Sequence, residues 1–127
     1  MKLVPIDKFD DEACANLKAA SDEELKPYIA ELLECLQDLN WPIAAPVSDR
    51  LSMLGLDLVK PVVKVLSGND DVWKYWLVSH FLYQVNDEVF RELSFKLEDI
   101  KSHPTSGEIE EEVFDAVCEL LRSRNTS

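Results

Sequence analysis

One stretch, residues 70–83, constrains the fold of this chain more than any other. It contains two tryptophans, two tyrosines and a phenylalanine, and it opens with Asp70 and Asp71, which suit a helix start. On a helical wheel its apolar residues cover nearly the whole circumference, and such a helix is usually covered by its neighbours. We therefore predict a central helix here, with the other helices packed around it.

Apolar residues at helical spacing continue along the rest of the chain, and only 3 glycines are present, too few for the many tight turns of a β-rich fold. The chain has 127 residues, of which 46% are hydrophobic, so we expect a single domain over residues 1–127 with a substantial core. The other predicted helices cover residues 10–20, 21–38, 42–54 (with a kink or a later start at Pro46), 56–66, 86–100 and 108–122.

Charge and cysteine content narrow the function classes. The net charge is −12, which opposes nucleic-acid binding and docking on an anionic membrane, and permits steering toward a basic partner. Cys14, Cys35 and Cys118 lie far apart in helical patterns, which is typical of free core cysteines. No apolar run approaches a signal peptide or the about 20 residues of a membrane span. We therefore expect a cytoplasmic protein.

A repeat with a displacement of 34 residues links two parts of the chain: residues 26–29 (KPYI) recur as residues 60–63 (KPVV). The first unit, from Pro27 to Leu51, resembles a HEAT repeat, in which a proline in the first helix precedes a leucine-rich run and an Asp turn opens the second helix. Residues 61–82 resemble it too, and residues 86–121 match in helix pattern only. The resemblance implies an all-α fold, an α-α superhelix of about three HEAT-like helix pairs plus an N-terminal capping helix.

A closer resemblance covers the whole chain. The Asn40-Trp41-Pro42 turn, residues 69–76 and the lead-in over residues 6–10 are similar to a small bacterial family of unknown function. The resemblance implies a HEAT-like fold and no assigned activity, and it implies no site.

Aromatic residues are the main candidates for a binding site, because Trp and Tyr dominate protein-binding hot spots. We favour core packing for most of them, and the matching repeat positions of Trp41 and Trp73 favour a shared packing role for that pair. Five large aromatics are hard to bury completely in a small domain, so we expect one or two to reach a groove. Together with His80, the candidate ligand- or partner-binding residues are Trp41, Trp73, Tyr75, Trp76, His80 and Tyr83.

Polar candidates have plain structural alternatives. His80, beside Ser79, suits acid–base chemistry. We favour a partly buried histidine with a local hydrogen bond, because adjacent helix residues do not face each other. The acids at the helix turns (Asp38, Asp70, Asp71 and Asp87) are typical helix caps, and the alternative is a cation site along one edge. We interpret the acidic run over residues 108–112 as a solvated face. The two histidines and three cysteines lack metal-ligand spacing, so we predict no catalytic residue, metal or cofactor.

Helix stacks of this kind generally present a concave groove that binds proteins. Our first hypothesis is therefore a non-enzymatic protein-binding module, with an acidic inhibitor of immunity type for a basic partner as one concrete form. The alternative is an enzyme or small-ligand protein with a pocket beside the central helix around His80. A third hypothesis is a homodimer subunit, and the sequence leaves monomer and homodimer open.

Overall fold

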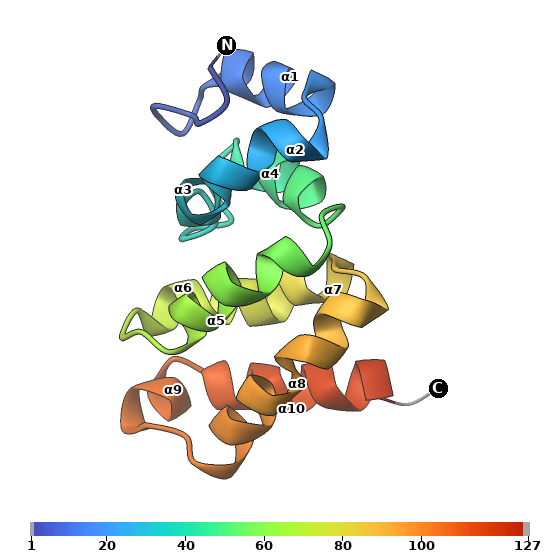
Figure 1. Cartoon of the computed structure of the whole chain (residues 1–127). Coiled ribbons are helices and arrows are strands. Elements are labelled where there is room, and N and C mark those ends of the chain that lie inside the picture. Colours follow the sequence, from blue (N-terminus) through green and yellow to red (C-terminus); the bar gives the residue numbers. More distant parts are fainter. Residues whose placement is uncertain (1, 126–127) are drawn as a thin grey trace.

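The computed structural model describes residues 2–125 as a stack of helices joined by short turns (Figure 1), with no strand among those residues. The prediction of an all-α fold is confirmed. The helices are α1 (Asp11–Ala19), α2 (Asp22–Leu25), η1 (Lys26–Tyr28), α3 (Ile29–Glu34), α4 (Ala44–Leu51), η2 (Leu56–Leu58), α5 (Val59–Leu66), α6 (Asp71–Trp76), η3 (Leu77–Phe81), α7 (Leu82–Gln84), α8 (Asp87–Ser102), α9 (Ser106–Glu110) and α10 (Val113–Asn125).

Neighbouring helices pack as consecutive pairs: α3 on α4, α5 on α6, and α8 on α10. The first members form one layer, because α3 contacts α5 and α5 contacts α8. The second layer contains α10 and the continuous helical segment α6–η3–α7, which we call the central helix. In Figure 1, α5 lies in front of α6 and α8 in front of α10. The HEAT-like superhelix itself stays a prediction.

Helix starts follow the local capping signals. The Asp10 carboxylate accepts a hydrogen bond from the Ala13 N–H at 3.2 Å, and Ser21 and Glu24 form a capping box at the start of α2, as their spacing predicts. Asp70 caps α6 and Asn86 caps α8 in the same way. The helix predicted around Pro42 or Pro46 begins at Ala44, so Pro46 lies in the first turn, where its missing N–H leaves no bond unmade.

The central helix is buried on one side and open on the other. Leu77, Val78, Phe81 and Leu82 are completely buried, which confirms its place in the core. The prediction that it is covered on nearly all sides is wrong, because its second face, with Val72, His80 and Tyr83, is exposed. A helical wheel shows where apolar residues lie but not how many neighbours cover them.

Two backbone irregularities escape the sequence prediction. The central helix widens into a π-helix at Leu77–Phe81. The final helix, predicted as one element over residues 108–122, is broken into α9 and α10 at Glu112, whose φ of 64° is left-handed. The break turns α9 so that Ile109 is 55% exposed, although the pattern predicted it to be buried.

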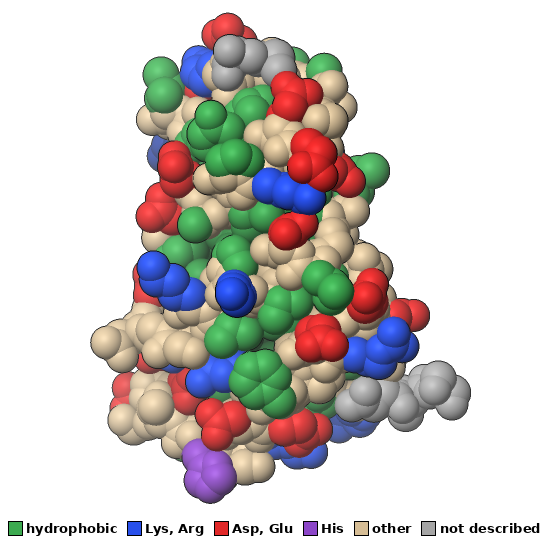
Figure 2. Space-filling view, in the orientation of Figure 1, with side chains coloured by type: hydrophobic (Ala, Val, Ile, Leu, Met, Phe, Trp, Pro, Cys, Tyr) green, Lys and Arg blue, Asp and Glu red, His purple; other side chains and the backbone are tan. Residues whose placement is uncertain are grey.

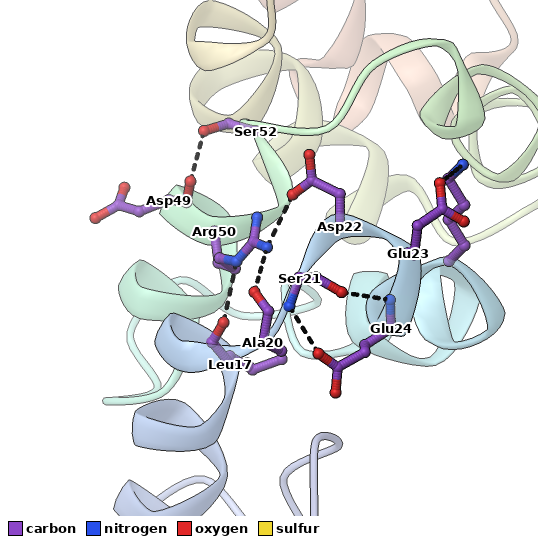
Figure 3. Close-up of polar contacts among 10 residues, drawn as sticks. Leu17, Ala20, Ser21, Asp22, Glu23, Glu24, Asp49, Arg50 and Ser52 are labelled. Atoms are coloured by element: carbon purple, nitrogen blue, oxygen red, sulfur yellow. Dashed lines mark hydrogen bonds and ion pairs between the residues drawn. The ribbon is translucent and has the colours of Figure 1, made fainter.

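Arg50 fixes α1 and α2 to α4 (Figure 3). Its Nε donates a hydrogen bond to the Leu17 carbonyl at 3.0 Å, and its Nη2 donates to the Ala20 carbonyl at 2.8 Å and to the Asp22 carboxylate at 2.9 Å. The Arg50 side chain therefore satisfies carbonyls at the end of α1 that no later turn of that helix can reach.

The face formed by α5 and α8 mixes hydrophobic, acidic and basic side chains (Figure 2). Basic side chains lie at the level of α5, whose lysines Lys60 and Lys64 are exposed. Among the described residues, no helix is both long and apolar enough to cross a membrane.

Candidate functional site

The site that we consider functional is a groove between the central helix and α10, with a volume of about 400 Å³. It is lined by Tyr75, Ser79, Tyr83, Glu112, Asp115, Ala116 and Glu119. Tyr75, Ser79 and Tyr83 follow one another at four-residue spacing, so they share one side of the central helix. Ser79 and Ala116 are the small members of the two walls, and their short side chains leave the space that the groove occupies.

The two walls run in the same direction (Figure 1). At one end, the Lys74 ammonium of α6 bonds Glu108, four residues before Glu112. At the other end, Arg124 of α10 donates hydrogen bonds of 2.8 Å to the carbonyls of Leu82 and Val85, which end the central helix. Glu112 therefore lies toward the Tyr75 end of the groove and Glu119 toward the Tyr83 end.

The groove carries two local departures from regular helix. Ser79 lies in the π-helix, a form that recurs at functional sites, and its buried hydroxyl oxygen makes no hydrogen bond within residues 2–125. Glu112 holds a left-handed conformation that favours glycine or asparagine and costs free energy for other residues. Both irregular residues line the groove, which is why we consider the groove a candidate functional site.

Only Glu111 and Glu112 lie between α9 and α10. The Glu112 N–H donates to the Ile109 carbonyl at 3.2 Å, and its carbonyl accepts from the Ala116 N–H at 3.0 Å. One left-handed residue thus ends one helix and starts the next. The Glu112 carboxylate therefore lies at the groove. A glycine at this position would supply the same turn without a charge.

The electrostatic field in the groove is negative. Glu112 and Asp115 form no ion pair with any described residue, whereas Glu119 pairs with Arg122. Burial and then the charge of Glu119 raise the pKa of Tyr83, with Arg122 opposing the shift. The contribution of Glu119 has the sign expected beside a carboxylate, a group that also attracts cations.

Tyr75 is held from the side by Trp76. Their ring centroids are 5.2 Å apart and the ring planes meet at 71°, which is an edge-to-face contact. Both side chains are half-buried. The Tyr75 wall of the groove is thus an aromatic pair rather than a lone ring.

The structure divides the six predicted site residues into two groups. Tyr75 and Tyr83 line the groove, Trp76 braces Tyr75, and His80 is exposed one turn from Trp76 and Tyr83. The prediction of a partly buried His80 is wrong, because its side chain is exposed.

The other two predicted residues, Trp41 and Trp73, lie elsewhere. The Trp73 indole donates to the Leu33 carbonyl at 3.0 Å and faces a hollow between α3 and α5. Trp41 is half-buried against the core near the N-terminal lead-in. Both tryptophans pack against neighbouring helices, away from the groove.

Three acidic groove residues are absent from the predicted site: Glu112, Asp115 and Glu119. A usable signal existed, because positions 112, 115 and 119 have helical i, i+3, i+7 spacing and therefore share one side of a helix. The sequence could not show that this side meets Tyr75 and Tyr83.

Two other polar places serve the fold. The hollow between α1 and α4, about 610 Å³ in volume, has Arg50 in its wall. The Nε and Nη2 of that guanidinium hold Leu17, Ala20 and Asp22, whereas its buried Nη1 has no hydrogen-bond partner within residues 2–125. The buried Lys74 ammonium lies 3.0 Å from both Asp71 and Glu108. Within residues 2–125, no group of three His, Cys, Asp or Glu side chains is placed to hold a metal ion.

Comparison with known proteins adds a family and no activity. No curated protein sequence matches the chain. One family, described as a domain of unknown function (DUF5071), has a sequence model that matches residues 3–121. This match confirms the resemblance to an uncharacterised family, and because it covers nearly the whole sequence, the chain belongs to the DUF5071 family.

Proposed function

We propose that this protein is a non-enzymatic protein-binding module that docks a basic segment of its partner in the groove between the central helix and α10. The observation that carries the proposal is that one groove is lined both by two tyrosines and by Glu112 and Asp115. These two carboxylates form no ion pair within the described residues. An acidic inhibitor of immunity type is one form that such a module takes.

The chemistry of the two walls supports the proposal. Tyrosine buries a large apolar area at low entropic cost and is enriched at binding hot spots. Unpaired surface carboxylates add steering, because a complementary field accelerates encounter with a basic surface. The net charge of −12 extends that field over the molecule.

An enzyme built around His80 has less support from the geometry. His80 is exposed, and its imidazole makes no hydrogen bond or ion pair with any residue between 2 and 125, so no side chain orients the ring. It also does not line the neighbouring groove. A general base is normally oriented by a partner and lies within reach of the substrate site.

Location and oligomeric state belong to the same proposal. Three free thiols suit a reducing compartment, so we propose that the module acts in the cytoplasm. Monomer and homodimer both fit, provided that the groove stays open in the assembly.

The test is partner capture with two charge-matched variants. The groove variant carries Glu112→Gln, Asp115→Asn and Glu119→Gln. The control carries Glu88→Gln, Glu92→Gln and Glu98→Gln, three exposed positions of α8 outside the groove. Both variants lose the same net charge, so they separate groove binding from general acidity.

Immobilised wild type, groove variant, control and His80→Gln are compared in cell extract at low and high salt. We expect one partner to be retained at low salt by wild type, control and His80→Gln, and lost by the groove variant. With the purified partner, Tyr83→Ala should weaken affinity by about 2 kcal/mol or more, and the groove variant should slow association. Equal retention by groove variant and control would refute the proposal.

A further inference from the structure

We propose that the groove is a subsite for one arginine side chain of the partner, and that it selects a guanidinium over the ammonium of lysine. The inference rests on the proposed function and specifies the group that the module recognises. It follows from how the tyrosine wall and the carboxylate wall face each other.

The groove offers a flat apolar surface on one side and hydrogen-bond acceptors on the other. Tyr75 and Tyr83 stand at the two ends of one wall, and Glu112, Asp115 and Glu119 follow one side of the parallel α10. A planar group lying between the walls can stack its face on a tyrosine ring while its edge donates to a carboxylate.

A guanidinium has the shape and donors for both contacts. It is planar, weakly hydrated on its faces, and carries five N–H donors in a fork that matches a carboxylate. The lysine ammonium is compact and strongly hydrated, so it gains the charge attraction but not the stacking. A volume of about 400 Å³ with small residues Ser79 and Ala116 between its walls leaves room for a planar head group.

A guanidinium–carboxylate pair already lies at the edge of the groove. The Arg122 guanidinium bonds the Glu119 carboxylate, one turn along α10. Tyr83 and Glu119 line the same groove, so the ring of one and the carboxylate of the other border the same space. Because Glu119 is already paired with Arg122, a guanidinium from a partner would meet the tyrosine wall and the carboxylates of Asp115 and Glu112, which form no ion pair within residues 2–125.

The test uses three short peptides that are identical except for one central residue: arginine, lysine or citrulline. Citrulline keeps the size and planarity of arginine and removes its charge. Each peptide is titrated into ¹⁵N-labelled protein at low salt, and the dissociation constant is read from the amide shifts of groove residues, including Ser79 and Ala116. We expect the arginine peptide to bind about fivefold tighter than the lysine peptide, which corresponds to a cation–π contribution of about 1 kcal/mol. The citrulline peptide should bind weakest.

Matched variants separate the two walls. Tyr83→Phe keeps the ring and should keep the preference for arginine, whereas Tyr83→Leu should reduce it to less than about twofold because the cation–π contact is lost. Asp115→Asn should weaken the arginine and lysine peptides alike, and Glu98→Gln on α8 should change neither. If Tyr83→Leu does not fold, the comparison of three peptides on wild type still decides the question.

The outcomes distinguish this inference from the proposed function. Equal affinity for the arginine and lysine peptides, lost in Asp115→Asn, would overturn the arginine subsite and leave a general basic docking groove. Shifts that miss the groove residues, or no binding of either peptide, would also overturn the subsite. The proposed function would then be decided by the comparison of partner capture between the groove variant and its control.

Discussion

The ammonium of Lys74 lies 3.0 Å from Glu108 Oε2, and the two side chains are only 4% and 5% exposed. This pair ties the central helix to α9. Glu108 has a second task, because its Oε1 accepts the Thr105 N–H at 2.8 Å in a capping box. Asp71 completes the cluster at 3.0 Å from Lys74, and its carboxylate lies so close to Gly107 that a Cβ at that position would overlap it. The fold thus depends on a buried charge network with a glycine fitted against it.

Lys74→Met should destabilise the protein by about 3–5 kcal/mol, because it leaves the Glu108 carboxylate buried without a cation. Urea unfolding followed by circular dichroism measures the change. The double variant Lys74→Met, Glu108→Gln should recover a large part of the loss, since glutamine is neutral and keeps an acceptor for Thr105. If the double variant were as unstable as the sum of the two single variants, the two side chains would not be coupled.

The Lys74–Glu108 pair also predicts how the stability of the fold depends on alkaline pH. Burial alone would lower the pKa of Lys74, but hydrogen bonds and charge attraction from Asp71 and Glu108 outweigh it, so the pKa is raised above the ordinary lysine value of 10.5. A raised pKa means that the folded state holds the proton more tightly than the unfolded state. The contribution of Lys74 is therefore fully present below pH 10.5 and is lost as pH rises through the folded-state pKa.

Wild type and Lys74→Met are to be compared in thermal melts from neutral to strongly alkaline pH. The difference in their melting temperatures should stay constant through the neutral range and shrink only at the alkaline end. A difference that already shrinks near neutral pH would contradict the raised pKa of Lys74.

The sequence predicts the fold best where the cause is local. Asp10 and the Ser21–Glu24 pair cap their helices as their spacing indicates, and Leu77 is buried as the apolar pattern predicts. These features need only a few neighbouring residues, so propensity and periodicity determine them.

The candidate site is less predictable because it depends on contacts between distant segments. Tyr83 and Glu119 are 36 positions apart in the sequence and meet only because α10 packs along the central helix. Lys74 reads as a polar exception on a helical wheel, and its burial follows from Glu108, 34 positions away. No glycine or proline stands at the break near Glu112. The sequence alone therefore indicates one helical face for the acidic run over residues 108–112.

Cysteine reactivity should report on packing at the N-terminal end of the stack. Burial raises the pKa of Cys35 to about 11, with smaller contributions from Cys14 and Glu34, and burial followed by the charges of Asp11 and Asp10 raises the pKa of Cys14. The thiolate is the reactive form. Cys118, half-buried on α10, should therefore react first with iodoacetamide at mildly alkaline pH.

Intact-mass and peptide mass spectrometry measure the order of alkylation. Denatured protein, in which all three cysteines should react without prior reduction, is the control. Alkylation of Cys35 as fast as Cys118 in the native protein would show that the N-terminal helices open readily and that its burial is transient.

The last prediction concerns the strain at Glu112. Because its φ of 64° is costly for any residue with a Cβ, Glu112→Gly should stabilise the protein by about 1 kcal/mol. For a domain of this size the melting temperature should rise by about 3–5 °C. The same change removes one groove carboxylate, so binding of the arginine peptide should weaken while stability improves. Glu112→Gln is the matched control, because it removes the charge but keeps the strained side chain: it should weaken binding without raising the melting temperature. A Glu112→Gly protein that melts no higher than wild type would show that the left-handed turn carries no strain, and one that gains stability but binds unchanged would remove Glu112 from the site.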